Sequence, residues 1–393
     1  MNGFKRICAV VLGTVLFVAG MLKLMDPTGT TLIVEEYLKF FRMGFLSFGA
    51  RALGLLLALV ESLLGAAIIT GVWRRVTAIA SACLLGFFTI ITLILWIVNP
   101  SMDCGCFGEA LHLTHFQSFL KNVVLLVLWA AAFLPMAKLG EPQRVKYVSF
   151  AIAAVSVALF TLYSLLSLPM ADFTPLKPGT ELLGASEGDF GDVTAYIYEK
   201  DGREGAFTED CPPDSGWTFV RTDTYDRDFI EEDAPQQMLS FCDASGEYVD
   251  TLALKGPVMA ISSYDPSKLK PAALSSLAAF ASEAEKAGFT VLFLTAGTPD
   301  TISETVTDPT LLADSYFADR RLLLTLNRSN GGVTYLCDGQ VCAKWSGRAL
   351  PSNEELDSIL SSDPVEYMME KTRKGKVRLQ AVLLYTFAVM LLL

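Results

Sequence analysis

Long apolar runs fill the first 171 residues of the 393-residue chain, and they constrain its fold more than any other feature. A helix of roughly 20 apolar residues crosses a bilayer core, where each backbone polar group must be bonded within the segment. The sequence therefore predicts an α-helical transmembrane bundle of five helices, with a shorter sixth run at the chain end. The runs are 7–25, 51–74, 76–102, 116–137, 147–171 and 379–393.

Basic residues in the connections orient this bundle, because cytoplasmic loops are rich in Lys and Arg. Connections on one side carry them, whereas the loop 99–115 on the other side has none. We expect the basic side to be the cytoplasm of a bacterial inner (plasma) membrane, and residues 172–378 to be extracytoplasmic. The basic stretch 371–378 is an exception, since it would lie on the outer side. The first run follows Lys5 and Arg6 as a signal peptide would. We expect it to be retained as a helix and not cleaved, because no small-residue cleavage pattern follows it.

Residues 172–378 have the composition of an acidic soluble domain and account for the negative net charge of the chain, which is −11 in all. This balance argues against a nucleic-acid partner, whose phosphates need Lys and Arg. Six of the eight cysteines lie in loops or in this domain, an even number that suits an oxidising compartment. Six unrelated thiols in a reducing compartment are the alternative. We expect membrane lipid and extracytoplasmic protein thiols or client proteins as partners.

Cys104 and Cys106 stand one residue apart in the outward loop before the fourth run. A disulfide between them would close a small, strained ring, and strain raises the reduction potential so that the bond exchanges easily. Gly105 tolerates the backbone geometry that such a ring demands. The pattern predicts a redox pair, and the alternatives are a static disulfide or a chance pairing.

Both histidines of the chain, His112 and His115, follow Cys106 within nine residues. With Cys104 and Cys106 they would provide four ligands for zinc or copper, but the Cys-x-Cys spacing is tighter than usual zinc patterns, so we assign no metal. An imidazolium that lowers a cysteine pKa is one alternative. Histidines that simply line the membrane interface are the other.

Glu61 is the one charged residue inside the second run, and a charge at membrane depth is costly. It must face the bundle interior, be protonated or find a partner, for which Lys23 is a candidate. Two roles follow, a proton relay for thiol chemistry and a structural hydrogen bond that fixes the second helix. An ion transporter is disfavoured, because only Lys121 adds to these intramembrane charges.

Four short strings resemble the DoxX/MauE family of membrane proteins, in which MauE is the methylamine utilisation accessory protein. They are 20–27 (GMLKLMDP), 61–65 (ESLLG), 103–108 (DCGCFG) and 120–122 (LKN). The resemblance implies a four-helix core similar to vitamin K epoxide reductase, a membrane disulfide-forming enzyme, with Cys104 and Cys106 as the reactive pair. The residues themselves specify no cofactor, and the resemblance to the reductase suggests a quinone. The chain departs from the reductase in lacking a Cys-x-x-Cys within a helix.

Short alternating and apolar runs after residue 190 predict an α/β domain. We expect strands at 193–198, 258–262, 289–294, 332–336 and 340–345, helices at 271–287 and 353–360, and hairpins around 243–246 and 338–339.

The order of these elements resembles a thioredoxin-like fold of the peroxiredoxin/TlpA kind. The matching strings are Ala234-Pro235, 243–246 (DASG) and the final hairpin. The catalytic cysteines of that family follow the strand equivalent to 258–262, but 262–268 contains none, and 328–332 lacks the usual cis-proline. The resemblance therefore implies a domain for binding or docking, without the active-site cysteines.

Cys337 and Cys342 flank the turn of the last expected hairpin. A two-residue loop would place them diagonally and a four-residue loop would place them opposite one another. Either geometry suits a structural disulfide, and a redox pair that exchanges with Cys104 and Cys106 is the alternative. Cys211 and Cys242 would form a second structural pair, by elimination only.

The chain thus divides into a DoxX/MauE-like four-helix membrane domain, a fifth transmembrane helix, a β-rich segment, a thioredoxin-like domain and a marginal sixth membrane helix. The predicted function is thiol–disulfide exchange or electron relay through Cys104 and Cys106 at the outer membrane face, the activity of a thiol-disulfide oxidoreductase. The alternative is a non-catalytic, membrane-anchored accessory protein whose thioredoxin-like domain binds clients during envelope-protein maturation. The five parts cover 1–140, 145–171, 172–233, 234–362 and 379–393.

Overall fold

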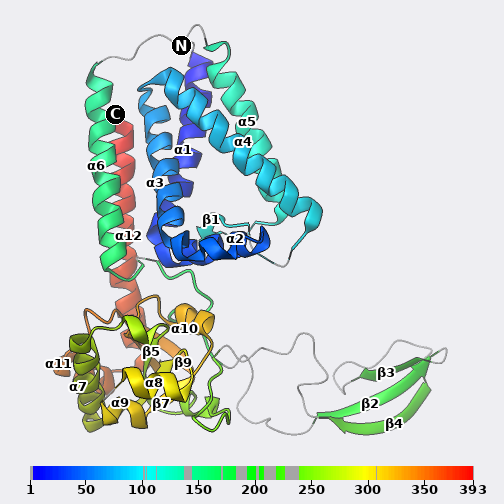
Figure 1. Ribbon diagram of the computed structural model, residues 1–393, viewed down its shortest axis with the longest axis vertical. Coiled ribbons are helices and arrows are strands. Elements are labelled where there is room, and N and C mark those ends of the chain that lie inside the picture. Colours follow the sequence, from blue (N-terminus) through cyan, green and yellow to red (C-terminus); the bar gives the residue numbers. More distant parts are fainter. Residues whose placement is uncertain are drawn as a thin grey trace.

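The computed structural model comprises a helical bundle and an α/β domain beyond one end of it (Figure 1). A small antiparallel sheet forms a third part. The structure describes residues 3–100, 102, 104–111, 113–136, 144–169, 171–182, 193–200, 203–207, 218–225, 239–306 and 308–392.

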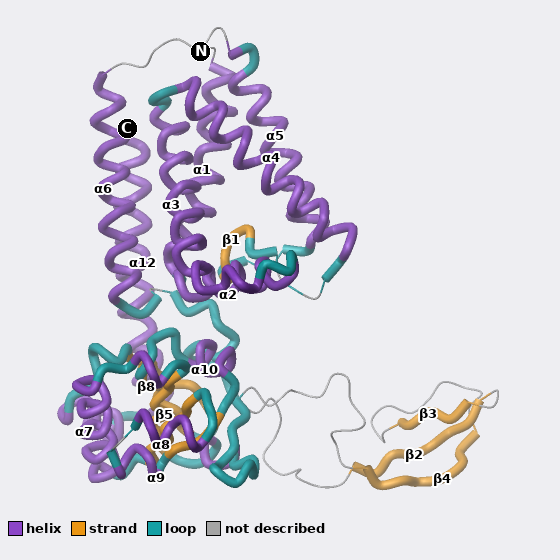
Figure 2. Tube along the Cα trace, in the orientation of Figure 1, coloured by secondary structure: helices purple, strands orange, loops and turns teal. Residues whose placement is uncertain are grey.

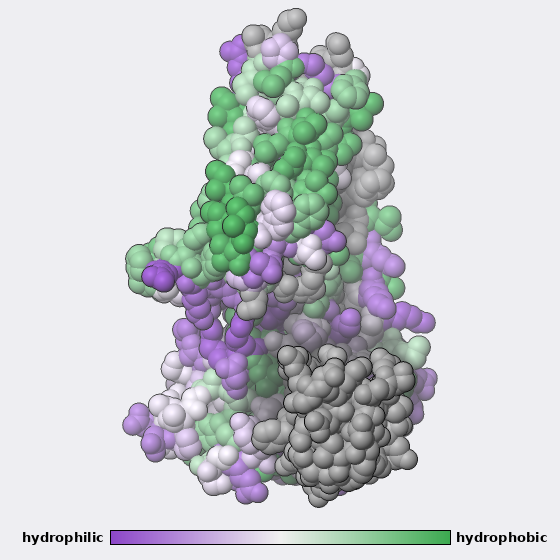
Figure 3. Space-filling model, turned by 90° about the vertical axis from the view of Figure 1, so that its right-hand side faces the viewer, coloured by the Kyte–Doolittle hydropathy of each residue, from purple (hydrophilic) through white to green (hydrophobic). Residues whose placement is uncertain are grey.

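Five helices within the described residues are long and apolar enough to cross a membrane, which confirms the five long runs. Their surface is largely apolar, and hydrophilic side chains gather below them where the α/β domain begins (Figure 3). These features fit a multi-pass membrane protein. The helices are α1 (Gly3–Met25), α3 (Ala50–Thr70), α4 (Arg74–Val98), α5 (His115–Phe133) and α6 (Arg144–Leu166).

Glycines bring α1 and α3 close together along their length. A Cβ atom at Gly20 would lie 2.3 Å from the Ser62 hydroxyl, and one at Gly65 would lie 2.5 Å from the backbone nitrogen of Phe17. Small residues let membrane helices approach closely enough to gain packing energy without a hydrophobic driving force. The α1–α3 pair is therefore the closely packed centre of the bundle.

A shorter helix, α2 (Pro27–Phe40), lies across the end of the bundle nearest the α/β domain (Figure 2). The Asp26 side chain caps it by accepting a 2.9 Å hydrogen bond from the backbone N–H of Gly29, and Pro27 occupies the first helical position, where its missing N–H costs nothing. The short strand β1 (Cys106–Glu109) lies against α1 and α2. Helix α2 was not predicted from the sequence.

The α/β domain contains a five-stranded mixed sheet in the order β7-β6-β5-β8-β9. The first three strands of that order run parallel, and β8 is antiparallel to both β5 and β9. Buried apolar side chains line both faces of the sheet. The strands are β5 (Pro257–Ser263), β6 (Thr290–Thr295), β7 (Ser315–Phe317), β8 (Gly332–Cys337) and β9 (Gln340–Trp345).

Helices of the α/β domain confirm the expected segments 271–287 and 353–360. The hairpin expected around 243–246 is a turn held by single bridges, and a 3₁₀ turn (Asp250–Ala253) follows it instead of a strand. Asp338 and Gly339 have positive φ in the expected tight turn between β8 and β9. The helices are α7 (Pro271–Ala287), α8 (Pro299–Thr305), α9 (Pro309–Ala313), α10 (Arg320–Leu326) and α11 (Asn353–Ser361).

The last helix, α12 (Pro364–Leu392), begins in the α/β domain and contains the sixth apolar run. It is not among the five described helices that meet the length and apolarity needed to span, so a sixth membrane helix stays a prediction. The separate sheet has the order β3-β2-β4. Its strands are β2 (Val193–Lys200), β3 (Arg203–Phe207) and β4 (Thr218–Tyr225).

Candidate redox site

Cys104 and Cys106 lie at the end of the bundle, between α4 and α5, with their sulfur atoms 3.4 Å apart. Gly105 between them has a φ of 60°, the left-handed conformation that glycine adopts without strain. A Cβ atom at this position would also lie 2.4 Å from the Cγ2 atom of Ile33 on α2. Both the backbone conformation and the packing against α2 therefore suit a glycine at this position.

Helix α2 covers the first of the two cysteines. The Tyr37 hydroxyl donates a 2.6 Å hydrogen bond to the carbonyl oxygen of Cys104 and lies 3.9 Å from its sulfur. Cys104 is only 5% exposed, whereas Cys106 is partly exposed. Cys106 is therefore the more accessible thiol of the pair.

The two thiols differ in acidity because their surroundings differ. The hydrogen bond with Cys104, aided by the charges of Lys121 and Lys23, lowers the pKa of Cys106 to about 5 against the cost of burial. The same hydrogen bond, together with burial, raises the pKa of Cys104. Cys106 is consequently the thiolate at neutral pH, and thiolates are the nucleophiles in disulfide exchange.

Glu61 and Lys23 form a buried ion pair in the bundle, with 2.5 Å between the Nζ and Oε2 atoms and side chains 6% and 3% exposed for Lys23 and Glu61. The partner expected for Glu61 from the sequence is thereby confirmed. Lys23 also lies 5.5 Å from the ring centroid of Phe88. The pair brings a cation close to Cys106 without leaving an unpaired charge in the membrane.

One face of α5 turns polar groups toward the cysteine loop. His115 Nε2 lies 3.0 Å from the carbonyl oxygen of Pro100, and the Lys121 ammonium lies 4.8 Å from the ring centroid of Phe107. Within the described residues, His115 Nδ1 and Asn122 Oδ1 are buried without a hydrogen-bond partner. The Ser118 hydroxyl lies close to both thiols and acts to lower the pKa of each. The effects of Ser118 and Lys121 on the thiols were not predicted from the sequence.

The four-ligand metal site considered for Cys104, Cys106, His112 and His115 is not tested, because His112 lies outside the described residues. Among those that the structure does describe, no group of three or more His, Cys, Asp or Glu side chains is placed to hold a metal ion.

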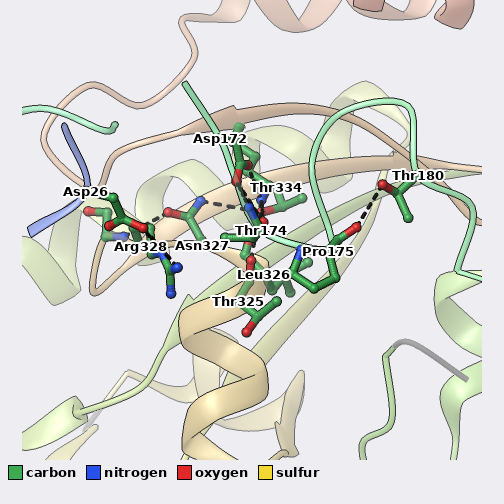
Figure 4. Close-up of polar contacts among 12 residues, drawn as sticks. Asp26, Asp172, Thr174, Pro175, Thr180, Thr325, Leu326, Asn327, Arg328 and Thr334 are labelled. Carbon is green, nitrogen blue, oxygen red and sulfur yellow. Dashed lines mark hydrogen bonds and ion pairs between the residues drawn. The ribbon is translucent and has the colours of Figure 1, made fainter. Parts of the chain in front are cut away.

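The α/β domain contacts this end of the bundle through a buried arginine (Figure 4). Arg328, which follows α10, places Nη2 2.9 Å and Nε 3.0 Å from Oδ2 of Asp26. Its Nη2 also lies 4.0 Å from Oε2 of Glu109 at the end of β1. A Cβ atom at Gly29 would lie within 3.0 Å of all three side chains, so glycine leaves room for them to converge. Asp26 thus caps α2 and binds the α/β domain at once.

Two ion pairs that are more exposed also join the α/β domain to α2. Arg320 Nη1 lies 3.7 Å from Oε2 of Glu35, and Arg321 pairs with Glu36. Exposed pairs of this kind contribute little individually, typically below about 1 kcal/mol. The buried Arg328 therefore dominates the docking of the α/β domain on α2.

We expect the Asp26→Asn variant to loosen this docking by about 1.5–3 kcal/mol, the value of a hydrogen bond to a charged group. Asparagine caps helices as well as aspartate does, so α2 should persist. Hydrogen exchange over residues 26–40 and 320–332 measures the effect. Glu36→Gln, which removes an exposed pair, is the matched control and should change exchange little. Equal exchange in the two variants would contradict a docking role for Arg328.

The cysteines of the α/β domain are free thiols in the structure. Burial raises the pKa of Cys342 to about 12 and also raises the pKa of Cys337. Cys342 lies at a bulge, where the β8–β9 register shifts. A disulfide between Cys337 and Cys342 stays a prediction. Cys242 has its thiol 3.6 Å from the carbonyl oxygen of Phe317, and its expected partner Cys211 lies outside the described residues.

Two parts of this chain match models of known protein families. No curated protein and no solved structure matches it. Residues 193–225, which hold β2 to β4, match the family model called Domain of unknown function (DUF8463). Residues 1–136, which hold α1 to α5 and both Cys104 and Cys106, match the family model of the methylamine utilisation protein MauE. The bundle from α1 to α5 is thus a MauE-like membrane region.

Proposed function

We propose that the protein is a membrane thiol–disulfide oxidoreductase that reacts through Cys104 and Cys106. The observation that carries this proposal is the pair of thiols 3.4 Å apart in which Cys106 has its pKa lowered to about 5. Two adjacent thiols of unequal acidity suit disulfide exchange, because the thiolate attacks and the more acidic thiol also leaves faster.

The exchange would begin with the pair oxidised. A partner thiolate attacks the more accessible Cys106 sulfur of the Cys104–Cys106 disulfide, and Cys104 departs and takes up a proton. The second thiol of the partner then displaces Cys106, so that the partner gains a disulfide and two electrons and two protons pass to the site. One proton goes to Cys104 and the other to a neighbouring base, because Cys106 remains a thiolate. A quinone in the bilayer is the acceptor class that would take up the electrons and protons and become a quinol.

Glu61 acts through Lys23 in this proposal. Their ion pair keeps the ammonium group near Cys106, where it stabilises the thiolate, and the Glu61 carboxylate would accept the second proton of the exchange. The proton relay and the structural role considered from the sequence are therefore joined in one pair.

The α/β domain would serve as a thioredoxin-like docking module. Its strand order β6-β5-β8-β9, with β7 added at the edge, supports the thioredoxin-like assignment. At the end of β5, where that family carries its cysteines, Asn330 instead accepts a 3.2 Å hydrogen bond from the backbone N–H of Asp265 and donates a 2.6 Å bond to its carbonyl oxygen. Arg328 is two residues away, so this edge of the domain is the one that meets the bundle.

The location in this proposal is the bacterial plasma membrane, with the α/β domain outside the cytoplasm. The distribution of basic residues supports that orientation. The match to a methylamine utilisation protein supports a role as an accessory protein, in which the partner thiols belong to a client that matures outside the cytoplasm.

A second candidate function is a non-catalytic anchor whose α/β domain binds clients. The absence of cysteine from residues 262–268 favours it. In this alternative the Cys104–Cys106 pair only stabilises the loop before α5, and the client never forms a covalent bond with the protein.

Trapping of mixed disulfides tests the two candidates against each other. The Cys104→Ser variant keeps the reactive Cys106 but removes the thiol that would resolve a mixed disulfide, so we expect a covalent client adduct on non-reducing gels. The matched control is Cys104→Ser/Cys106→Ser, in which the adduct should vanish. Absence of any adduct in the single variant, under both oxidising and reducing growth, would favour the anchor.

A further inference from the structure

A cavity of about 1370 Å³ lies where α6, α12 and the α/β domain meet. It is larger than the roughly 300–1,000 Å³ of ordinary small-molecule pockets. Because α6 is one of the candidate membrane spans and ends at Leu166, the cavity lies where this helix leaves the bilayer. This is the depth of the lipid headgroups.

The cavity wall changes from apolar to charged across its depth. Tyr163 near the end of α6, Leu168 just after that helix and Leu379 of α12 line the part toward the membrane. Charged side chains of the α/β domain and of the first half of α12 line the remainder. A phospholipid has the same order of polarity, from its apolar acyl chains to its charged headgroup.

Three of the six carboxylates in the cavity lining pair with lysines of the same lining. Asp172 pairs with Lys344 at 2.6 Å, and Glu370 pairs with Lys374 at 2.8 Å. Glu355 pairs with Lys371 at 2.7 Å and also accepts hydrogen bonds from Trp345 and Tyr367. The other three, Glu354, Asp363 and Glu366, lie at the starts of α11 and α12 within the α/β domain.

Two lysines of the lining are not compensated in this way. Lys177, on the segment that follows α6, and Lys376, on α12, have no carboxylate partner in the described part of the chain. They approach the cavity from two different segments, and their exposed ammonium groups are free to bind an anion.

The segment around Lys376 adds to this positive charge. Residues 371–378 (KTRKGKVR) hold five Lys and Arg directly before the last apolar run. Basic clusters next to a membrane segment attract anionic lipid headgroups. Such a contact also accounts for a basic stretch on the side of the bundle where few cations are expected.

We propose that this cavity binds the phosphate headgroup of an anionic phospholipid, with Lys177 and Lys376 as the phosphate ligands and the acyl chains directed along Leu168 and Leu379. The bound lipid fills the space between α6 and α12 and holds the α/β domain against the membrane. This site is separate from the cysteine pair and does not depend on its chemistry.

Native mass spectrometry of the full-length protein from nanodiscs of phosphatidylcholine and phosphatidylglycerol tests this site. The protein should retain phosphatidylglycerol preferentially. The Lys177→Gln/Lys376→Gln variant should bind it about thirty-fold more weakly, as expected for the loss of two interfacial cations. Both side chains are exposed, so the variant should fold.

The matched control, Arg373→Gln/Lys255→Gln, removes the same charge from residues outside the cavity and should weaken binding by about five-fold or less. Equal losses in the two variants, or no preference for the anionic lipid, would overturn the proposal. Displacement of the lipid by inorganic phosphate would also overturn it, because the site would then bind the free anion.

Discussion

Replacement of Lys23 by methionine is expected to destabilise the membrane bundle by about 3–5 kcal/mol, because it leaves the buried Glu61 carboxylate without its partner. Both side chains are almost fully buried, and their charged groups are 2.5 Å apart. In the bilayer an unpaired carboxylate must either remain charged at high cost or take up a proton. Unfolding by a denaturing detergent in mixed micelles measures the loss.

A double-mutant cycle separates the ion pair from simple packing. Glu61→Gln should destabilise the bundle as well, whereas Lys23→Met/Glu61→Gln should recover much of the stability, because no isolated charge remains. Additive losses in the double variant would mean that the two side chains do not interact as described. The conservative exposed substitution Lys39→Gln on α2 controls for loss of a positive charge alone.

Alkylation of Cys106 is expected to proceed at mildly acidic pH, where ordinary thiols hardly react. With its pKa lowered to about 5, Cys106 is mainly a thiolate at pH 6, and its rate should fall as the pH drops through about 5. At pH 6 the rate should exceed that of an unperturbed exposed cysteine roughly ten-fold, after allowing for the lower nucleophilicity of acidic thiols. Mass spectrometry of the peptide that holds Cys106 gives the rate.

A variant that lacks one of the cations near Cys106 tests the cause of its lowered pKa. Lys121→Gln should move the half-maximal rate to higher pH, whereas Lys39→Gln, which removes an exposed cation, should leave it in place. A rate profile centred near pH 8.5 in the unmodified protein would show that the pair holds no thiolate at neutral pH.

The transmembrane helices were predictable from the sequence because length and apolarity are local properties of a segment. The same holds for the tight turn at Asp338-Gly339 and for the helix Pro271–Ala287, which a proline opens and Gly288 ends. Helix α2 was missed because it is neither long enough to span nor regular in its apolar pattern. It forms by packing on α3 and by the Asp26 cap.

Part of the candidate site was equally local. The spacing of Cys104 and Cys106 and the glycine between them already indicated a close pair. The acidity of Cys106 was not predictable, because it arises from cations on α1 and α5 that only the fold brings together. The contact of Arg328 with Asp26 joins residues 302 positions apart, and no local pattern marks it.

The redox state of Cys104 and Cys106 in intact cells tests the central claim most directly. Cells are sampled before and after a pulse of dithiothreitol and quenched with acid. Free thiols are then alkylated, and the mass of the peptide that holds both cysteines is measured. A redox pair that turns over will be oxidised at rest, reduced by the pulse, and oxidised again once the reductant is removed. Two thiols that stay reduced throughout would contradict the proposed exchange.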